Sequence, residues 1–279
     1  MAAPLPAPGV GPPPDEGAAS GPCGSCAAAP GRLMRLGLAP GRHDHVVALA
    51  GNPNTGKSTV FNALTGLRQH VGNWSGKTVS RAEGGFTYGG ARYRIVDLPG
   101  TYSLLSTSTD EDVARDALLF GRPDVTVAVA DATRLERNLP LVLQVRQITG
   151  RVVVALNLVD EAARHGITVD TRHLSRELGV PVVATAARRG DGLPELLAAI
   201  AQVATTDDPP PPLALVHHDP ALEEAVATLA ARVEERFPGL PNSRWVALRL
   251  LEGDPGIEEA VRAGTLGELA GAPTPEAAA

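Results

Sequence analysis

One short segment, Gly51–Ser58, limits what this chain can fold into more than any other part of the sequence. It fits the pattern Gly-x-x-x-x-Gly-Lys-[Ser/Thr] of a phosphate-binding loop. The apolar run 46–50 precedes it and predicts a buried strand, and a helical pattern over 57–64 follows it. A strand, a glycine-containing loop and a helix in this order place consecutive backbone N–H groups around one anion. The segment therefore predicts an α/β domain that binds a nucleotide.

The residue types in this loop have chemical reasons. Gly51 and Gly56 let the backbone curl around a phosphate. The Lys57 ammonium is expected to reach the β- and γ-phosphates, where the planar fork of arginine fits poorly, and the Ser58 hydroxyl can ligate Mg²⁺. A glycine-rich turn with a chance lysine is the alternative, which the flanking strand and helix disfavour. The expected nucleotide contacts are Gly51, Asn52, Pro53, Asn54, Thr55, Gly56, Lys57, Ser58 and Thr59.

A second motif, Asp97-Leu98-Pro99-Gly100, follows a strand pattern over 92–96. An aspartate at such a position can hold Mg²⁺ through water, and Gly100 can offer its N–H to a γ-phosphate. By itself Asp-x-x-Gly is usually a turn, but its place at a strand end downstream of a phosphate loop favours the functional role. We expect all four residues to contact the nucleotide and Asp97 to be a Mg²⁺ ligand.

A third motif, Asn157-Leu158-Val159-Asp160, ends the strand pattern 152–156. The Asp160 carboxylate can accept hydrogen bonds from guanine N1–H and N2–H₂, donors that adenine lacks at those positions, so the motif favours GTP and GDP. A helix cap is the alternative role of Asp160. The backbone of a weaker segment, Thr185, Ala186 and Ala187, is expected near the guanine O6.

The polar, glycine-rich segment 67–80 lies between the phosphate loop and the next strand pattern, and we assign no strand to it and expect Trp74 to be exposed. In switch-type GTPases a threonine in this segment contacts Mg²⁺ and the γ-phosphate, and the only threonine here is Thr78. The start of the next strand is its alternative role. We expect Gly76 and Lys77 to contact the nucleotide as well. The catalytic candidates are thus Lys57, Thr78 and Gly100, and the Mg²⁺ ligands are Ser58, Thr78 and Asp97.

Strand and helix patterns alternate along most of the chain, which predicts a mostly parallel six-stranded sheet flanked by helices, the fold of a P-loop GTPase. A hairpin across Gly89-Gly90 supplies one antiparallel strand. Beyond a proline-rich break only helical patterns follow, so we expect a small all-α domain packed on the first. The expected parts are a Pro/Ala/Gly-rich tail over 1–44, the G domain over 45–206, a linker over 207–214, the helical domain over 215–265 and a loose tail over 266–279.

Composition excludes several other classes. The formal net charge is -6 in 279 residues, which argues against a nucleic-acid partner. No apolar run reaches the roughly 18 residues of a membrane-spanning helix, and the first 20 residues do not resemble a secretory signal. Two cysteines are too few for a disulfide framework, and we expect the protein to lie in the reducing cytosol. The pair Cys23 and Cys26 has the spacing of a metal or redox site, but an incidental pair is favoured because no strand or helix frames it.

Several segments resemble one known family, the bacterial ferrous iron transporter FeoB, over roughly residues 45–262. The sequence Val-Gly-Asn-Trp at 71–74 and the helical segment Arg244–Asp254 separate it from other small GTPases. The remaining segments that resemble the cytosolic G domain of FeoB are Gly51–Ser58, Asp97–Leu104 and Leu135–Leu139, and Arg244–Asp254 resembles the helical, GDI-like domain that follows it.

The resemblance implies a domain that binds GTP and Mg²⁺, hydrolyses GTP slowly and regulates Fe²⁺ uptake through a FeoB-type membrane domain or another transport component. It implies that Asn54 holds K⁺, which acts as an activator, and that the helical domain favours GDP binding. A homo-oligomer is a further candidate state. It implies a cytoplasmic location, at the inner face of the bacterial membrane if joined to a transport domain. No transport region is recognised in the sequence, so the chain is either a fragment or a stand-alone G protein.

Thr101 bears on the hydrolysis step, because it follows the Asp-x-x-Gly motif where Ras-type proteins have a water-orienting glutamine. Threonine is too short for that role, so we expect Mg²⁺, K⁺, Lys57 and backbone groups to suffice, with turnover on the order of 10⁻⁴ to 10⁻² per second. The alternative functions are a stand-alone regulatory or ribosome-associated-type GTPase not linked to iron, and a non-catalytic protein in which bound GTP or GDP only stabilises the surface that binds a partner.

Overall fold

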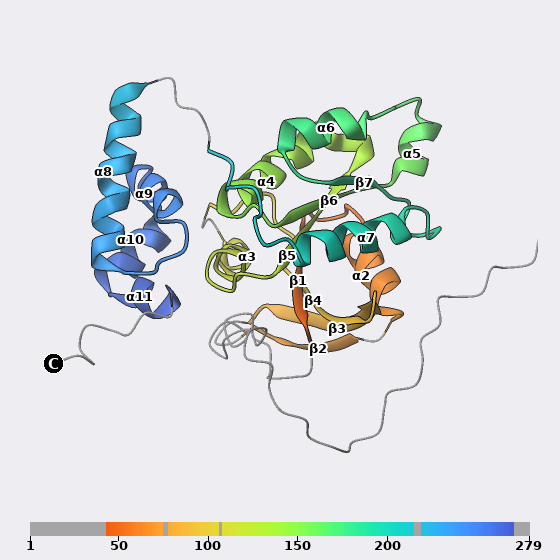
Figure 1. Cartoon of the computed structure of the whole chain (residues 1–279), viewed down its shortest axis with the longest axis horizontal. Coiled ribbons are helices and arrows are strands. Elements are labelled where there is room, and N and C mark those ends of the chain that lie inside the picture. The colour runs from red at the N-terminus through yellow and green to blue at the C-terminus, as the bar shows by residue number, and fades with distance from the viewer. Residues whose placement is uncertain (1–42, 68, 75–77, 106–107, 215–218, 271–279) are drawn as a thin grey trace, which may run out of the picture.

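The computed structural model describes residues 43–67, 69–74, 78–105, 108–214 and 219–270. Its centre is a seven-stranded sheet with the order β2-β3-β4-β1-β5-β6-β7 (Figure 1). Only β3 runs against its neighbours, so the sheet is mixed and mostly parallel, as the sequence predicts. The strands are β1 (His45–Gly51), β2 (Gln69–Asn73), β3 (Ser80–Tyr88), β4 (Ala91–Asp97), β5 (Val125–Asp131), β6 (Val152–Asn157) and β7 (Val182–Ala184).

The prediction of six strands was wrong by one strand, β2. This strand pairs with β3 at the edge of the sheet, and its Val71 side chain is 72% exposed. An edge strand that faces solvent lacks the apolar pattern that marks a buried strand, so β2 could not be predicted from such a pattern. The prediction for Trp74 was also wrong, because its side chain is 5% exposed and belongs to the hydrophobic core.

Helices cover both faces of the sheet. Val60, Phe61, Leu196 and Ile200 pack α2 and α7 against one face, and α3 and α4 pack against the other. Buried strands of valine, leucine and alanine between two helical layers are what a parallel sheet requires. The helices of this part are α2 (Lys57–Thr65), α3 (Thr109–Leu119), α4 (Leu135–Ile148), α5 (Val159–Arg164), α6 (Thr171–Leu178) and α7 (Leu193–Ala204), with a short 3₁₀ helix, η1 (Ala132–Arg134), before α4.

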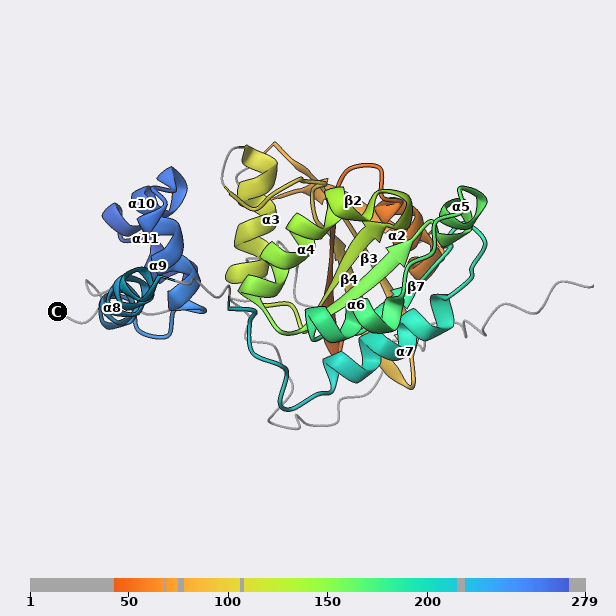
Figure 2. The same ribbon diagram turned by 90° about the horizontal axis from the view of Figure 1, so that it is seen from above.

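A second, helical part lies beside α3 and α4 in both views (Figures 1 and 2). Its apolar side chains, Trp245 and Ile257 among them, belong to the same hydrophobic cluster as those of α3 and α4. Asn242 Nδ2 donates to the carbonyl of Gln147 at the end of α4, at 2.6 Å. Its helices are α8 (Pro220–Arg236), α9 (Ser243–Leu251), α10 (Pro255–Arg262) and α11 (Thr265–Ala270), and none of the described helices is both long and apolar enough to span a bilayer.

The segment that connects the two parts is bound to the sheet domain. The buried Arg146 guanidinium donates to the carbonyls of Leu178 and Pro211, at 3.0 and 3.3 Å. In return, Leu213 N–H donates to the Arg146 carbonyl at 2.7 Å. A Cβ atom at Gly150 would lie 1.6 Å from the Pro210 carbonyl oxygen, so the proline segment needs a glycine beneath it. These contacts hold the proline segment 210–213 on the sheet domain.

Candidate nucleotide-binding site

The segment 51–58 runs from the last residue of the buried strand β1, through a loop over 52–56, into the first turn of helix α2, as the sequence predicts. Gly51 ends β1, and Gly56 takes a left-handed conformation with φ 81° immediately before α2 begins at Lys57. Asn54, also left-handed with φ 66°, is exposed at the tip of the loop. This conformation directs the start of α2, with its free N–H groups and positive helix end, toward the space above the sheet edge.

The two invariant glycines of the motif are needed for steric reasons as well as for conformation. A Cβ atom at Gly51 would lie 2.7 Å from the Val129 carbonyl oxygen of β5. A Cβ atom at Gly56 would lie 2.3 Å from Nδ2 of Asn157. The phosphate loop is therefore packed closely against two other strand ends, and only glycine fits at these positions.

The Lys57 side chain crosses the site to the end of β4. Its ammonium forms an ion pair with the Asp97 carboxylate and donates a 2.6 Å hydrogen bond to the Leu98 carbonyl. Burial raises the pKa of the Asp97 carboxyl, and the Lys57 ammonium opposes that rise. The lysine of one motif and the aspartate of the next are thus in direct contact, which places both beside the phosphate loop.

Asn157 joins the phosphate loop to residues 185–187, the loop that follows β7. Its Nδ2 donates to the Thr55 carbonyl at 3.0 Å, and its Oδ1 accepts from Ala187 N–H at 3.1 Å and from the Thr185 hydroxyl at 3.2 Å. All of these groups are buried, so each polar atom has its partner inside the protein. Asn157 is therefore a positioning group for both loops.

Asp160 lies in the first turn of α5, and its carboxylate keeps some exposure, with Arg164 3.8 Å away. The residue that caps α5 is Leu158, in a left-handed conformation with φ 62°, so the helix-cap alternative for Asp160 is wrong. The Asp160 side chain is 25% exposed, so its carboxylate can receive donors from a base. Ala186 and Ala187 lie on the adjacent loop after β7.

The remaining metal candidates have oxygen donors at the same edge of the sheet. Ser58 is exposed in the first turn of α2, and Thr78 is exposed two residues before β3. Because β3 pairs antiparallel with β4 and Ala82 lies opposite Asp97, residue 78 extends past the end of β4 toward the site. The predicted contacts Gly76 and Lys77, and the pair Cys23 and Cys26, lie outside the described residues.

The loop after Gly100 is held by its own side chains. The Thr101 hydroxyl donates to the Ser103 carbonyl at 2.8 Å, and the Ser103 hydroxyl donates to Glu111 of α3 at 2.8 Å. Thr101 is buried, so its hydroxyl is used within the loop. This agrees with the expectation that it does not replace a water-orienting glutamine.

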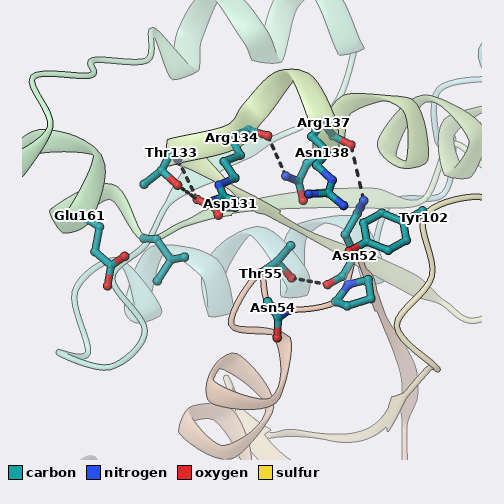
Figure 3. Close-up of a pocket in the computed structure, with 12 residues that line it drawn as sticks. Asn52, Asn54, Thr55, Tyr102, Asp131, Thr133, Arg134, Arg137, Asn138 and Glu161 are labelled. Atoms are coloured by element: carbon teal, nitrogen blue, oxygen red, sulfur yellow. Dashed lines mark hydrogen bonds between the residues drawn. The ribbon is translucent and has the colours of Figure 1, made fainter.

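A cavity of about 290 Å³ lies between the phosphate loop and the start of α4 (Figure 3). The loop residues Asn52 to Thr55 form one wall and the start of α4 forms the other, with Tyr102 at one end and Glu161 at the opposite end. Sequence reasoning did not single out Tyr102, Arg137 or Asn138 at this cavity. Their only sequence signal is their position in the segments 97–104 and 135–139.

Comparison with protein families gives two matches in order along the chain. Residues 45–200 match the family described as Ferrous iron transport protein B, and residues 218–272 match the family described as FeoB cytosolic helical domain. Together they cover most of the sheet domain, with its candidate site, and all four helices of the helical part.

Individual proteins and structures give the same result. The Fe(2+) transporter FeoB of Salmonella choleraesuis is 42% identical over 212 residues, which is 75% of this chain and 27% of that protein. The cytosolic domain of T. maritima FeoB in a GDP form superposes with a TM-score of 0.73 at 38% identity, covering 82% of this chain and 87% of that one. Its GMPPNP form gives 0.70 at 39% identity, covering 80% and 86%. The chain spans about a quarter of the length of the curated relatives it matches.

Proposed function

Because this chain belongs to the FeoB family of ferrous iron transport proteins, we propose that it binds GTP and GDP, hydrolyses GTP slowly and thereby regulates Fe²⁺ uptake through a FeoB-type membrane domain. The related T. maritima domain has been solved in GDP and GMPPNP forms, which supports guanine nucleotides as the ligands. We place this domain in the cytoplasm, at the inner face of the membrane. No feature of the site favours the ribosome-associated alternative.

The observation that carries this proposal is the convergence of three motifs on one edge of the sheet. The phosphate loop follows β1, the Asp97–Gly100 motif ends β4 and the Asn157–Asp160 motif ends β6. The Lys57–Asp97 ion pair and the Asn157–Thr55 hydrogen bond connect the motifs directly. In an open parallel sheet, ligands bind outside the carboxyl ends of the strands, which is where these groups lie.

The geometry suggests how the residues would act on GTP. Lys57 would exchange the Asp97 carboxylate for the β- and γ-phosphates, and the amides of the loop and of α2 would hold the rest of the triphosphate. The Gly100 N–H would bind the γ-phosphate. Since the Thr101 hydroxyl is already bonded to Ser103, backbone groups would orient the attacking water, which fits slow turnover.

The donors around Lys57 fit Mg²⁺, since the hydroxyls of Ser58 and Thr78 and the Asp97 carboxylate are the hard oxygen ligands that this ion prefers. When bound, Mg²⁺ neutralises charge on the phosphate oxygens. Asn54 offers an exposed amide oxygen at the tip of the loop and is the proposed K⁺ ligand. Asp97 ends β4, Ser58 lies in the first turn of α2, Asn54 lies in the loop before α2, and Thr78 precedes β3 by two residues.

Regulation is supported by the contact between the two parts of the chain. Helix α3 directly follows the loop that carries Gly100, and its buried Arg115 lies 3.9 Å from Asp254, the N-cap of α10. Glu111 of the same helix holds Ser103 of that loop. A displacement of the loop on hydrolysis would therefore act on the helical part through α3.

Phosphate release from GTP and from ATP by the purified chain, in K⁺ and in Na⁺, tests the proposal. We expect Mg²⁺-dependent turnover of GTP only, faster in K⁺. Asp160→Asn is the matched control, because it keeps the shape of the side chain but turns one acceptor into a donor; it should weaken GTP and GDP binding at least tenfold. Equal turnover of ATP and GTP by the unchanged chain would refute the role of Asp160.

The K⁺ site has its own test. Asn54→Ala should abolish the difference between K⁺ and Na⁺, because the carboxamide that would hold K⁺ is lost. GDP affinity should stay unchanged, because the side chain is exposed and the backbone N–H groups of the loop remain. Equal K⁺ stimulation in the variant and the unchanged chain would remove Asn54 as the ligand without affecting the assignment of the nucleotide.

A further inference from the structure

Tyr102 and Arg137 connect the loop after Gly100 to the start of α4. The guanidinium carbon of Arg137 lies 4.7 Å from the centroid of the Tyr102 ring. Figure 3 shows both side chains at one end of the cavity beside the phosphate loop. Tyr102 is two residues beyond Gly100, and Arg137 is the third residue of α4. A cation this close to an aromatic face is attracted by the ring quadrupole, whose negative part lies over that face.

Arg137 also contacts the phosphate loop. The buried Asn52 side chain directs its Nδ2 at the Arg137 carbonyl oxygen, at 3.5 Å. None of the ion pairs between described residues involves Arg137, so its guanidinium has no carboxylate that competes with the Tyr102 ring. One residue of α4 therefore lies against both loops that would face the terminal phosphate.

A second bond from α4 fixes the same loop two residues further on. Gln144 Oε1 accepts a 2.7 Å hydrogen bond from Leu104 N–H, and the Leu104 side chain is buried. The loop is thus attached to α4 at Tyr102 and at Leu104. Of the two attachments, the one at Tyr102 is nearer to Gly100 and is the one exposed to solvent.

We propose that Arg137 is a positioning residue for GTP hydrolysis, which holds Tyr102 so that the backbone of Gly100 and Thr101 stays beside the phosphate loop. This inference rests on the proposed function. GTP has the γ-phosphate that Gly100 would bind and GDP does not, so loss of the contact slows hydrolysis and leaves GDP binding as it is. An exposed cation–π contact corresponds to an effect of about two- to fivefold.

Four variants test this: Arg137→Ala, Arg137→Lys, Tyr102→Leu and Tyr102→Phe. Measured at saturating GTP, Arg137→Ala and Tyr102→Leu should each lower kcat about two- to fivefold, and the double variant should be no slower than either. Arg137→Lys and Tyr102→Phe keep a cation and a ring, so they should retain most of the rate. Arg134→Ala is the matched control, since Arg134 lines the same cavity without contacting the ring, and it should match the unchanged chain.

Hydrogen exchange of the amides over 100–105, followed without nucleotide, gives a readout that does not require turnover. It should speed up in Arg137→Ala and Tyr102→Leu and stay slow in Tyr102→Phe and Arg134→Ala. Unchanged exchange, additive rate effects, or a loss of GDP affinity equal to the loss of kcat would overturn the role of Arg137. Absence of GTP turnover in the unchanged chain would count against the proposed function alone. The exchange measurement would still show whether the contact between Arg137 and Tyr102 holds the loop.

Discussion

The ammonium of Lys57 and the carboxylate of Asp97 form an ion pair that links the start of α2 to the end of β4. Their side chains are only 10% and 16% exposed. Burial nevertheless raises the pKa of Asp97 more than the lysine lowers it. The site therefore holds a carboxylate that the folded protein ionises less readily than the unfolded chain does.

The stability of the protein should depend on pH through Asp97. Because its folded pKa is above the ordinary value of 3.8, the folded state binds this proton more tightly, and ionisation favours unfolding. In Asp97→Asn the group no longer titrates. The free energy of unfolding of the unchanged protein, minus that of the variant, should therefore fall as the pH rises from about 4 through the raised pKa of Asp97. Urea denaturation of both proteins over this range measures the difference, and a difference that grows with pH would contradict the expectation.

Gly56→Ala should destabilise the protein and weaken nucleotide binding. A left-handed conformation costs a residue with a Cβ about 1–2 kcal/mol, and here the methyl group would also lie 2.3 Å from Asn157 Nδ2. Gly66→Ala is the control, because Gly66 has a similar φ of 62° and nothing within 4 Å of an added Cβ. The free energy of unfolding should fall clearly further for Gly56→Ala, and GDP affinity should fall in that variant only. Equal losses in both would show that the closeness of Asn157 is unimportant.

Asn242 should contribute to stability by two separable contacts. Its Oδ1 caps α9 by accepting from Trp245 N–H at 3.1 Å, and its Nδ2 donates to the carbonyls of Gln147 and Ile148. Asn242→Ala removes both and should cost about 2–3 kcal/mol. Asn242→Asp keeps the cap but not the donor, so thermal unfolding should still show a loss. Full stability of Asn242→Asp would mean that the contact with α4 contributes nothing.

The parts of the fold that the sequence predicted are those in which a local pattern and the tertiary structure agree. Strands β1, β5 and β6 are continuous apolar runs because both of their faces are covered, and α2 begins at Lys57, as predicted. The strand β2 was not predicted because an edge strand leaves no such pattern. Trp74 was misjudged for a related reason: its neighbours in sequence are polar, and only the folded sheet shows that its ring joins the core.

The meeting of the three motifs could be predicted from the sequence. Segment 51–58, Asp97 and Asn157 each stand at the end of a strand pattern, and the carboxyl ends of parallel strands lie at one edge of the sheet, where the structure brings them together. Their roles toward a nucleotide stay predictions. The hydrogen bonds that Asn157 makes to Thr55 and Ala187 join residues 102 and 30 positions apart and could not be read from spacing. The same holds for Tyr102 and Arg137, whose contact depends on how α4 lies beside the loop.

The hydrophobic cluster that α3 and α4 share with α8–α11 has a consequence for unfolding. Two bodies joined only by a linker melt independently, each at its own temperature. Here α3 and α4 share one buried cluster of apolar side chains with α8–α11, so unfolding of either part exposes apolar side chains of the other. Heating should therefore give one calorimetric peak for the whole described chain.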